Sequence, residues 1–325
     1  MKKQKILITG AAGFIGYWLC KKLLDNKNNE VVGLDNLNSY YSVKLKKERI
    51  KELKKAKNFI FLKLDLLEKK KLNQLFQKKK FNFVYNLAAQ AGVRYSFENP
   101  ESYCDSNIIG FNNILNLVEK FKVKKLFFAS SSSVYGDIGP FPKKENSKLN
   151  TLNIYSLSKL ANEITAKLFA KKSKTQIIGL RFFSIYGEWG RPDMLIYKYL
   201  KSVFDKKSKF YLNNYGNHTR DFTYINDVIE ILYKLLNIKF TKNNNVINIC
   251  SNNPIKITKI LNHINDYFKK RPLIYKRSFQ KADVKKTHGS NLKIKKLFKK
   301  KRFTDLNLAL TNTCSWFKKN SKLFI

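Results

Sequence analysis

The sequence holds few of the residues that build metal centres and disulfide frameworks. Its 325 residues include only 3 histidines and 4 cysteines. No histidine lies near a cysteine or another histidine, which excludes the ligand spacings of a zinc site, so no metal is expected. The cysteines are widely separated and lie in apolar stretches, so we expect reduced, mostly buried thiols. They are Cys20, Cys104, Cys250 and Cys314.

Negative charge is also scarce. The chain has 65 Lys and Arg against 23 Asp and Glu, a formal net charge of +42, yet only eight of the basic residues are arginine. The lysines are scattered through nearly every segment, without a basic stripe or tail. Dispersed lysines are typical of solvated faces, so no nucleic-acid partner is expected. A positive field would speed the capture of an anionic small molecule.

Long apolar runs are absent as well. No uninterrupted apolar stretch approaches membrane-spanning length, and an apolar strand begins at Lys5 without a signal-peptide pattern before it. We therefore expect a cytoplasmic protein without membrane insertion.

What the chain does contain is a regular alternation. Short β-branched and aromatic runs recur between longer amphipathic stretches, and 43% of the residues are apolar. Continuous apolar strands are typical of a parallel sheet covered by helices on both faces. We predict an α/β fold with a doubly wound parallel sheet of the Rossmann type. Its strands are expected at residues 5–9, 30–35, 59–65, 83–88, 125–129, 176–182 and 246–250.

The alternation loses regularity after Phe183, where glycine and proline punctuate the chain, and it returns at a helical pattern over residues 226–236. This change predicts two parts. Residues 1–183 with 225–250 form the Rossmann domain. Residues 184–224 and 251–325 form a smaller lobe that covers the substrate.

A glycine-rich turn follows the first predicted strand and opens a helix, with the sequence Gly10-Ala11-Ala12-Gly13-Phe14-Ile15-Gly16. Gly10 allows the tight turn, Gly13 lets the backbone approach a pyrophosphate, and Gly16 permits close packing of helix on strand. The helix N-terminus favours phosphate charge. The turn therefore predicts a dinucleotide site.

Two acidic residues extend that site. Asp35 ends the second predicted strand, where a carboxylate accepts hydrogen bonds from the adenosine ribose and repels a 2′-phosphate, so NAD is favoured over NADP. Its alternative role is to cap a loop. Asp65, at the end of the third predicted strand, either hydrogen-bonds the adenine or caps the following helix.

Tyr155 and Lys159 stand four residues apart, so on a helix both project from one face. A nearby ammonium group favours the phenolate and lowers the pKa of Tyr155 toward neutrality, which makes Tyr155 a candidate general base. The alternative is an exposed Tyr-Lys pair of the kind expected in a lysine-rich chain.

A serine run ends the fifth predicted strand and lies at the carboxyl edge of the sheet, where doubly wound folds bind ligands. A hydroxyl from Ser130-Ser131-Ser132-Ser133 can hydrogen-bond a reacting oxygen. The alternative is a polar turn between strand and loop.

Together these elements resemble the extended class of the short-chain dehydrogenase/reductase superfamily, from Lys5 to about Phe317. Within that class the chain is similar to bacterial and plant UDP-glucuronate 4-epimerases. Sugar 4,6-dehydratases of the superfamily carry an acidic pair where this chain has only hydroxyls. The segments that carry the likeness are 87–96, 130–136, 181–187, 190–194 and 220–224.

The resemblance implies roles for individual residues. Tyr155 is the base, Lys159 holds the nicotinamide ribose and tunes Tyr155, and Ser131 hydrogen-bonds the sugar O4. The implied substrate-binding residues are the active-site Asn107, Arg220 at the diphosphate, Ser132, Ser133, Ser184 and Arg191 near the C5 substituent, and Asp283. The alternatives for Ser184 and Arg191 are a turn hydroxyl and a surface arginine.

The implied reaction is NAD-dependent epimerisation of UDP-glucuronate to UDP-galacturonate through a 4-keto intermediate, by an enzyme that is a homodimer paired through two helices. One alternative substrate is UDP-glucose or UDP-N-acetylglucosamine, with a neutral C6 group. A second alternative is a non-catalytic, basic, nucleic-acid-associated Rossmann protein, against which Tyr155, Lys159 and Ser131 argue.

Overall fold

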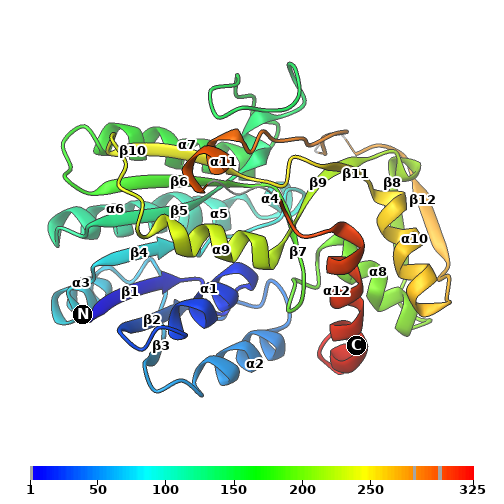
Figure 1. Ribbon diagram of the computed structural model, residues 1–325, viewed down its shortest axis with the longest axis horizontal. Coiled ribbons are helices and arrows are strands. Elements are labelled where there is room, and N and C mark those ends of the chain that lie inside the picture. Colours follow the sequence, from blue (N-terminus) through cyan, green and yellow to red (C-terminus); the bar gives the residue numbers. More distant parts are fainter. Residues whose placement is uncertain (1–2, 281–282, 299–301) are drawn as a thin grey trace.

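The computed structural model describes residues 3–280, 283–298 and 302–325. Its centre is a seven-stranded sheet in the order β10-β6-β5-β4-β1-β2-β3, in which every neighbouring pair is parallel (Figure 1). The predicted doubly wound sheet is thus confirmed, and all seven predicted strands belong to it. In chain order they are β1 (Gln4–Thr9), β2 (Asn29–Asp35), β3 (Phe59–Lys63), β4 (Phe83–Asn86), β5 (Lys125–Ser131), β6 (Gln176–Phe182) and β10 (Asn244–Ile249).

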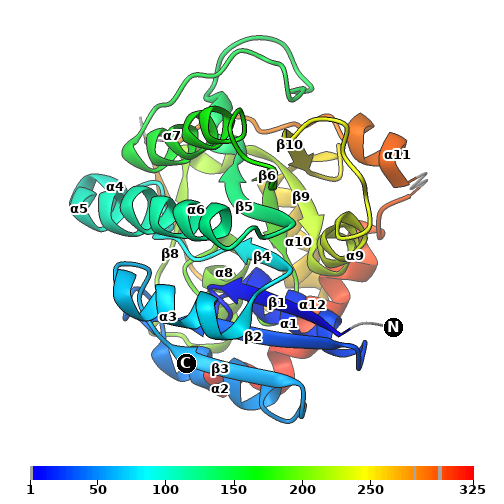
Figure 2. The same ribbon diagram turned by 90° about the vertical axis from the view of Figure 1, so that its left-hand side faces the viewer.

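Helices cover both faces of this sheet, as Figure 2 shows end-on. The side chain of Leu7 on β1 packs into one apolar core, and its neighbours Ile6 and Ile8 pack into the other. Strands buried on both faces need apolar residues at every position, which explains their continuous runs. One face carries α1 (Phe14–Leu24), α2 (Val43–Leu53) and α9 (Ile225–Leu235), and the other α3 (Lys69–Lys79), α6 (Gly110–Lys120) and α7 (Ile154–Phe169).

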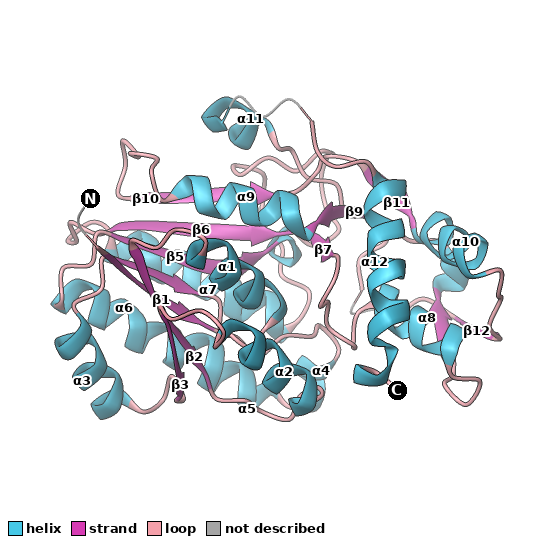
Figure 3. Cartoon of the chain, turned by 60° about the horizontal axis from the view of Figure 1, so that its bottom comes forward, coloured by secondary structure: helices cyan, strands magenta, loops and turns pink. Residues whose placement is uncertain are grey.

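A second group of elements lies beyond the carboxyl ends of the sheet strands (Figure 3). Two small sheets lie there, in the orders β11-β9-β7 and β12-β8. Their strands are β7 (Ser184–Tyr186), β8 (Phe210–Asn213), β9 (Thr219–Tyr224), β11 (Pro254–Lys256) and β12 (Ile274–Arg277). Three helices accompany them, α8 (Leu195–Phe204), α10 (Ile257–Phe268) and α12 (Leu306–Asn320), and α10 packs on both others.

Short helices complete the described chain. A π-helical turn precedes α6, and a 3-10 turn directly follows β5. These elements are α4 (Tyr95–Glu98), α5 (Pro100–Tyr103), the π-helix η1 (Cys104–Ile109), the 3-10 turns η2 (Ser132–Tyr135), η3 (Asn214–Gly216) and η4 (Ser321–Leu323), and α11 (Leu292–Phe298).

Three of the four cysteines are buried as predicted, whereas Cys104 is exposed because it lies on η1 at the surface. All four are free thiols. Within the described ranges, no helix is both long and apolar enough to cross a membrane.

Candidate active site

The glycine turn has the backbone geometry that its sequence predicts. Gly10 adopts a positive φ of 72°, and a Cβ placed there would lie 2.8 Å from the amide nitrogen of Ala88. A Cβ on Gly16 would lie 2.1 Å from the carbonyl oxygen of Gly10, so α1 approaches β1 as closely as only glycine permits. Gly13 stands immediately before α1 as its N-cap. The helix N-terminus therefore opens directly onto the turn.

Asp35 lies at the end of β2 beside this turn and is 8% exposed. Its carboxylate accepts hydrogen bonds from the amide of Ala12 at 3.1 Å and of Leu37 at 2.8 Å. Burial raises the pKa of Asp35, which these two amides and the ammonium of Lys46 oppose. The carboxylate is thus oriented by the same turn that would hold a pyrophosphate.

Asp65 does not end a strand, because β3 stops two residues earlier at Lys63. Its carboxylate accepts hydrogen bonds from the amide of Leu67 at 2.9 Å and from the side-chain amide of Asn36 at 2.7 Å. The N-cap residue of α3 is Glu68, not Asp65. Asp65 therefore joins the loops that follow β2 and β3, at the border of the same cavity.

A cavity of about 420 Å³ runs along the carboxyl edge of the sheet. The glycine turn and Asp35 form one part of its wall, and Tyr155 and Lys159 form another. A dinucleotide needs a wall that its pyrophosphate can approach closely and a carboxylate at its ribose, and both are present. The residues therefore fit NAD. The residues that line this cavity include Gly10, Gly13, Gly16, Lys46, Asp65, Gln90, Ser130, Ser131, Ser184 and Arg191.

Tyr155 and Lys159 occupy the first two turns of α7, as their spacing predicts. The Nζ of Lys159 lies 5.8 Å from the centre of the Tyr155 ring. Lys159 is 3% exposed, and its Nζ makes no hydrogen bond to any residue that the structure describes. Burial lowers the pKa of Lys159 to about 7. An ammonium without protein partners inside the cavity is available to bind hydroxyls of a ligand.

The predicted lowering of the Tyr155 pKa is wrong for the protein by itself. Burial raises the pKa of Tyr155 above its usual value of 10.0, and this effect outweighs the opposing contributions of Ser131 and Arg191. The spacing of Tyr155 and Lys159 predicted a stabilising charge, but the cost of burying a phenolate cannot be read from spacing.

The serine run separates into residues inside and outside the cavity. Ser131, the last residue of β5, lines the cavity, and its hydroxyl accepts hydrogen bonds from the amide of Ser133 at 3.1 Å and the hydroxyl of Ser133 at 2.8 Å. Ser132 and Ser133 belong to η2 and are not among the lining residues. Ser133 therefore acts on the cavity through Ser131, whereas nothing in the structure explains a site role for Ser132.

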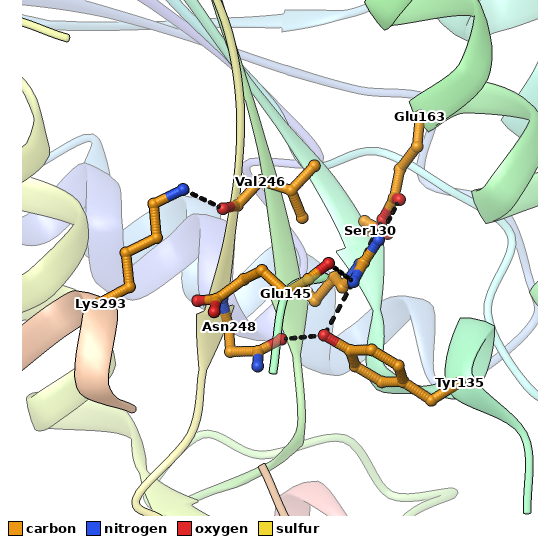
Figure 4. A network of polar contacts seen from close by, with 8 residues as sticks. Ser130, Tyr135, Glu145, Glu163, Val246, Asn248 and Lys293 are labelled. Atoms are coloured by element: carbon orange, nitrogen blue, oxygen red, sulfur yellow. Dashed lines mark hydrogen bonds and ion pairs between the residues drawn. The ribbon is translucent and has the colours of Figure 1, made fainter. Parts of the chain in front are cut away.

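A buried ion pair that the sequence did not reveal lies beside Ser130, in a network that Figure 4 shows. Glu163 on α7 and Arg181 on β6 form it, with Nη2 and Oε2 2.6 Å apart and each side chain at most 6% exposed. Glu163 also accepts a hydrogen bond of 2.5 Å from the Ser130 hydroxyl. The network continues from Arg181 to Tyr135 and from Tyr135 to Asn248 on β10, at 2.8 and 2.7 Å. It thus joins α7, β5, β6 and β10 immediately beneath the cavity.

Asn107 is not in the cavity wall, contrary to its implied contact with substrate. It is 2% exposed and lies on η1. Its carboxamide is fully used, because it exchanges hydrogen bonds with the backbone of Gln90 at 2.8 and 3.1 Å and donates to Ser158 at 2.9 Å. Since Gln90 lines the cavity and Ser158 precedes Lys159, Asn107 positions the wall from behind.

Ser184 and Arg191 both reach the cavity. Arg191 donates to the carboxylate of Asp193 from Nε at 2.9 Å and from Nη2 at 2.5 Å. Asp193 in turn accepts a hydrogen bond of 3.3 Å from Tyr40. The Nη1 of Arg191 makes no hydrogen bond to any described residue. One edge of the guanidinium is therefore held by protein and the other is available to an anion.

A second cavity of about 260 Å³ adjoins the first, with Phe14, Ser184, Ile185 and Met194 in the walls of both. Arg220 and Asp283 line it, as does Arg94, which lies in a segment of family likeness but was not predicted as a site residue. Arg94 and Asp283 form an ion pair of 2.6 Å. Burial lowers the pKa of Arg220, and Asp283 opposes this effect. Two guanidinium groups in one pocket favour an anionic ligand such as a diphosphate.

In the part of the chain that the structure describes, no three His, Cys, Asp or Glu side chains are grouped to hold a metal ion.

Known proteins resemble this chain over nearly its full length. Residues 6–250 match the family model described as the NAD dependent epimerase/dehydratase family. The chain is 36% identical over 326 residues to the UDP-glucuronate 4-epimerase of Thermodesulfobacterium geofontis, with 98% of this chain and 97% of that protein covered. It is 34% identical over 331 residues to UDP-glucuronate 4-epimerase 2 of Arabidopsis thaliana, covering 96% and 75%. A solved structure of Bacillus cereus UDP-glucuronic acid 4-epimerase in complex with UDP-glucuronic acid and NAD matches with a TM-score of 0.92 at 30% identity, covering 98% and 100%.

Proposed function

This chain belongs to the NAD dependent epimerase/dehydratase family, and we propose that it converts UDP-glucuronate to UDP-galacturonate by epimerisation at C4. One observation carries the proposal. Tyr155, Lys159, Ser131 and Arg191 border the same cavity as a glycine turn and a carboxylate that fit NAD. A base, a hydroxyl donor and a free cationic edge are therefore presented to one ligand beside its cofactor.

The side chains divide the chemistry between them. Tyr155 takes the proton of the sugar C4 hydroxyl and later returns it, while Ser131 hydrogen-bonds the same oxygen. NAD, held by the glycine turn, Asp35 and Lys159, would supply reversible hydride transfer at C4. Lys159 would hold the ribose of the cofactor and, in its charged form, would favour the Tyr155 phenolate. In the protein itself, Ser131 and Arg191 oppose the burial that raises the pKa of Tyr155. Return of the hydride to the opposite face of C4 would invert the configuration of that carbon, with no net oxidation of the sugar.

Arg191 and Ser184 support a carboxylated sugar. The unoccupied edge of Arg191 suits a carboxylate, and Ser184 lines both cavities between that edge and the second pocket. The 4-keto form of a glucuronate is a β-keto acid, which loses carbon dioxide when the carboxylate turns out of plane with the ring carbonyl. A carboxylate held by donors in a fixed orientation resists that loss.

The second cavity supports the nucleotide part of the substrate. Arg220 would bind the diphosphate, with Arg94 and Asp283 nearby. We accordingly assign nucleotide-sugar binding to residues 184–224 and 251–325, and cofactor binding to residues 1–183 with 225–250.

We also propose a homodimer paired through α7. Leu157, Ile164 and Leu168 are each more than half exposed and repeat at intervals of seven and four residues, which places them along one side of the helix. A continuous apolar stripe of this kind on a surface helix favours a protein partner.

The test of the reaction is direct. Purified protein is incubated with UDP-glucuronate and NAD, and the sugar is followed by proton NMR, with Tyr155→Phe as the control. Appearance of UDP-galacturonate that is lost in the variant supports both the reaction and the base. Epimerisation of UDP-glucose or UDP-N-acetylglucosamine alone would overturn the carboxylate assignment, and turnover of none of the three would overturn the epimerase.

A further inference from the structure

A single buried arginine links the cofactor turn to the segment that carries Arg191. Arg49 on α2 is 0% exposed. Its Nη1 donates to the carbonyl of Ala12, within the glycine turn, at 2.8 Å. Its Nη2 donates to the carbonyls of Trp189 and Gly190 at 2.5 and 3.1 Å. One planar guanidinium therefore fixes two segments that lie far apart in sequence and border the same cavity.

This arrangement is costly, which argues for a role beyond filling space. Among the described residues no carboxylate forms an ion pair with Arg49, and its Nε is buried without a hydrogen-bond partner. Its only other hydrogen-bond partner in the described part of the chain is the hydroxyl of Tyr41, at 2.9 Å. A buried cation held by neutral oxygens, without a carboxylate, stabilises the fold less than an apolar side chain of similar size would. What the guanidinium provides instead is a rigid fork of donors with fixed directions.

The segment that Arg49 holds is conformationally constrained. Trp189 adopts a φ of +59°, which a tryptophan rarely adopts. A Cβ on Gly190 would lie 2.2 Å from the ring of Tyr197, whose hydroxyl accepts a hydrogen bond from the Gly190 amide at 2.9 Å. The Arg49 contacts to both carbonyls help to hold this conformation. Arg191 follows immediately, so the direction of its side chain depends on it.

We propose that Arg49 is a positioning residue that holds Arg191 in place for the substrate carboxylate, and that it thereby sets the preference for a charged over a neutral C6 group. The inference rests on the proposed function. Tyr40, through Asp193, holds the Arg191 side chain, and Arg49 holds the backbone before it. Since both supports start from the region after β2, the cofactor half of the molecule defines the geometry of the sugar site.

The experiment measures the affinity of the NAD-loaded protein for UDP-glucuronate, UDP-glucose and UDP by calorimetry. Arg49→Met is expected to weaken the binding of UDP-glucuronate about tenfold, since a misaligned Arg191 loses part of its charged hydrogen bond to the carboxylate. UDP-glucose and UDP should change by less than about twofold. In an Arg191→Met background the same substitution should have no further selective effect.

Two further variants keep the test sharp. Lys125→Met removes a partly buried cation on β5 that donates to the backbone carbonyls of Leu235, Leu236 and Ile238 and lines neither cavity, so it should leave the ratio of UDP-glucuronate to UDP-glucose affinity unchanged. If Arg49→Met does not fold, Arg49→Lys, which keeps the charge without the planar fork, replaces it. An equal loss for all three ligands, no loss, or an additive loss with Arg191→Met would overturn the role of Arg49. Failure of the unmodified protein to prefer UDP-glucuronate would instead overturn the proposed substrate.

Discussion

Lys159 lies one helical turn beyond Tyr155 on α7, with its Nζ 5.8 Å from the phenol ring, and desolvation raises the pKa of Tyr155 and lowers that of Lys159. Burial favours the neutral form of each, so it opposes the very charge separation that a phenolate beside an ammonium represents. A ligand that contacts either group can therefore change the protonation of the pair. The ribose hydroxyls of a cofactor would hydrogen-bond the ammonium and make its charged form more favourable.

The first prediction concerns stability and pH. Burial lowers the pKa of Lys159 to about 7 from its usual value of 10.5, so between these values the unfolded chain holds a proton that the folded chain has released. Stability contributed by this group therefore rises with pH across that window and is lowest below about pH 7. Lys159→Met removes the charge. The variant should exceed the unmodified protein in melting temperature most at about pH 6, with a smaller difference at about pH 9.

The matched control for this measurement is Lys167→Met, on the same helix but exposed. Both variants are melted after removal of bound nucleotide. A Lys159→Met difference that did not change with pH, or that grew as pH rose, would contradict the burial of an ionisable ammonium.

The second prediction concerns the ion pair beneath the serine run. Glu163→Gln leaves the Arg181 charge buried without its carboxylate and weakens the hydrogen bond from Ser130. Breaking such a pair costs about 3–5 kcal/mol of unfolding free energy, measured by urea titration. The control is Glu230→Gln, which breaks the exposed pair with Lys22 and should cost at most about 1 kcal/mol. Similar losses of unfolding free energy in both variants would show that the buried pair stabilises the fold no more than the surface pair does.

Sequence patterns anticipated those features that depend on neighbouring residues. The seven strands follow from continuous apolar runs, and the positions of Tyr155 and Lys159 on one helix follow from their spacing. The glycine turn could be predicted equally well, because a positive φ and a close helix approach each require a residue without Cβ.

Features that depend on distant segments could not be predicted in this way. Glu163 and Arg181 meet only once α7 lies on the sheet, and the donors of Arg49 reach carbonyls about 140 positions away. The same reason explains Asn107, which family likeness assigns to substrate but whose carboxamide is fully bonded to Gln90 and Ser158. Spacing within a motif gives no information on which side chain of the motif will face the cavity.

The third prediction concerns the cofactor turn. A methyl group at Gly16 would lie 2.1 Å from the Gly10 carbonyl oxygen, which belongs to the backbone and cannot rotate away. Gly16→Ala should therefore displace α1 from the turn, cost about 1–3 kcal/mol of stability and weaken NAD binding about tenfold or more, measured by calorimetry.

Gly139→Ala provides its control. Gly139 has a φ of +73°, but a Cβ there would meet no atom closer than the Lys143 Nζ at 3.5 Å. Substitution at Gly139 should strain the local backbone and leave NAD affinity unchanged. Retained NAD affinity in Gly16→Ala would contradict the assignment of this turn to the pyrophosphate.

The fourth prediction tests the proposed dimer. Leu168 on α7 is 57% exposed, so a lysine at this position has access to water in a monomer and costs the isolated fold little. Across an interface related by two-fold symmetry, the same charge would be buried against the apolar stripe of the partner, where its desolvation opposes pairing. Leu168→Lys should therefore convert a dimer to a monomer in analytical ultracentrifugation, with the melting temperature of the monomer little changed.

Leu308→Lys on α12 is the control, because Leu308 is 56% exposed and lies away from α7, and it should leave the mass unchanged. A protein that is monomeric without any substitution, or a dimer that survives Leu168→Lys, would show that this stripe does not join two copies of the chain.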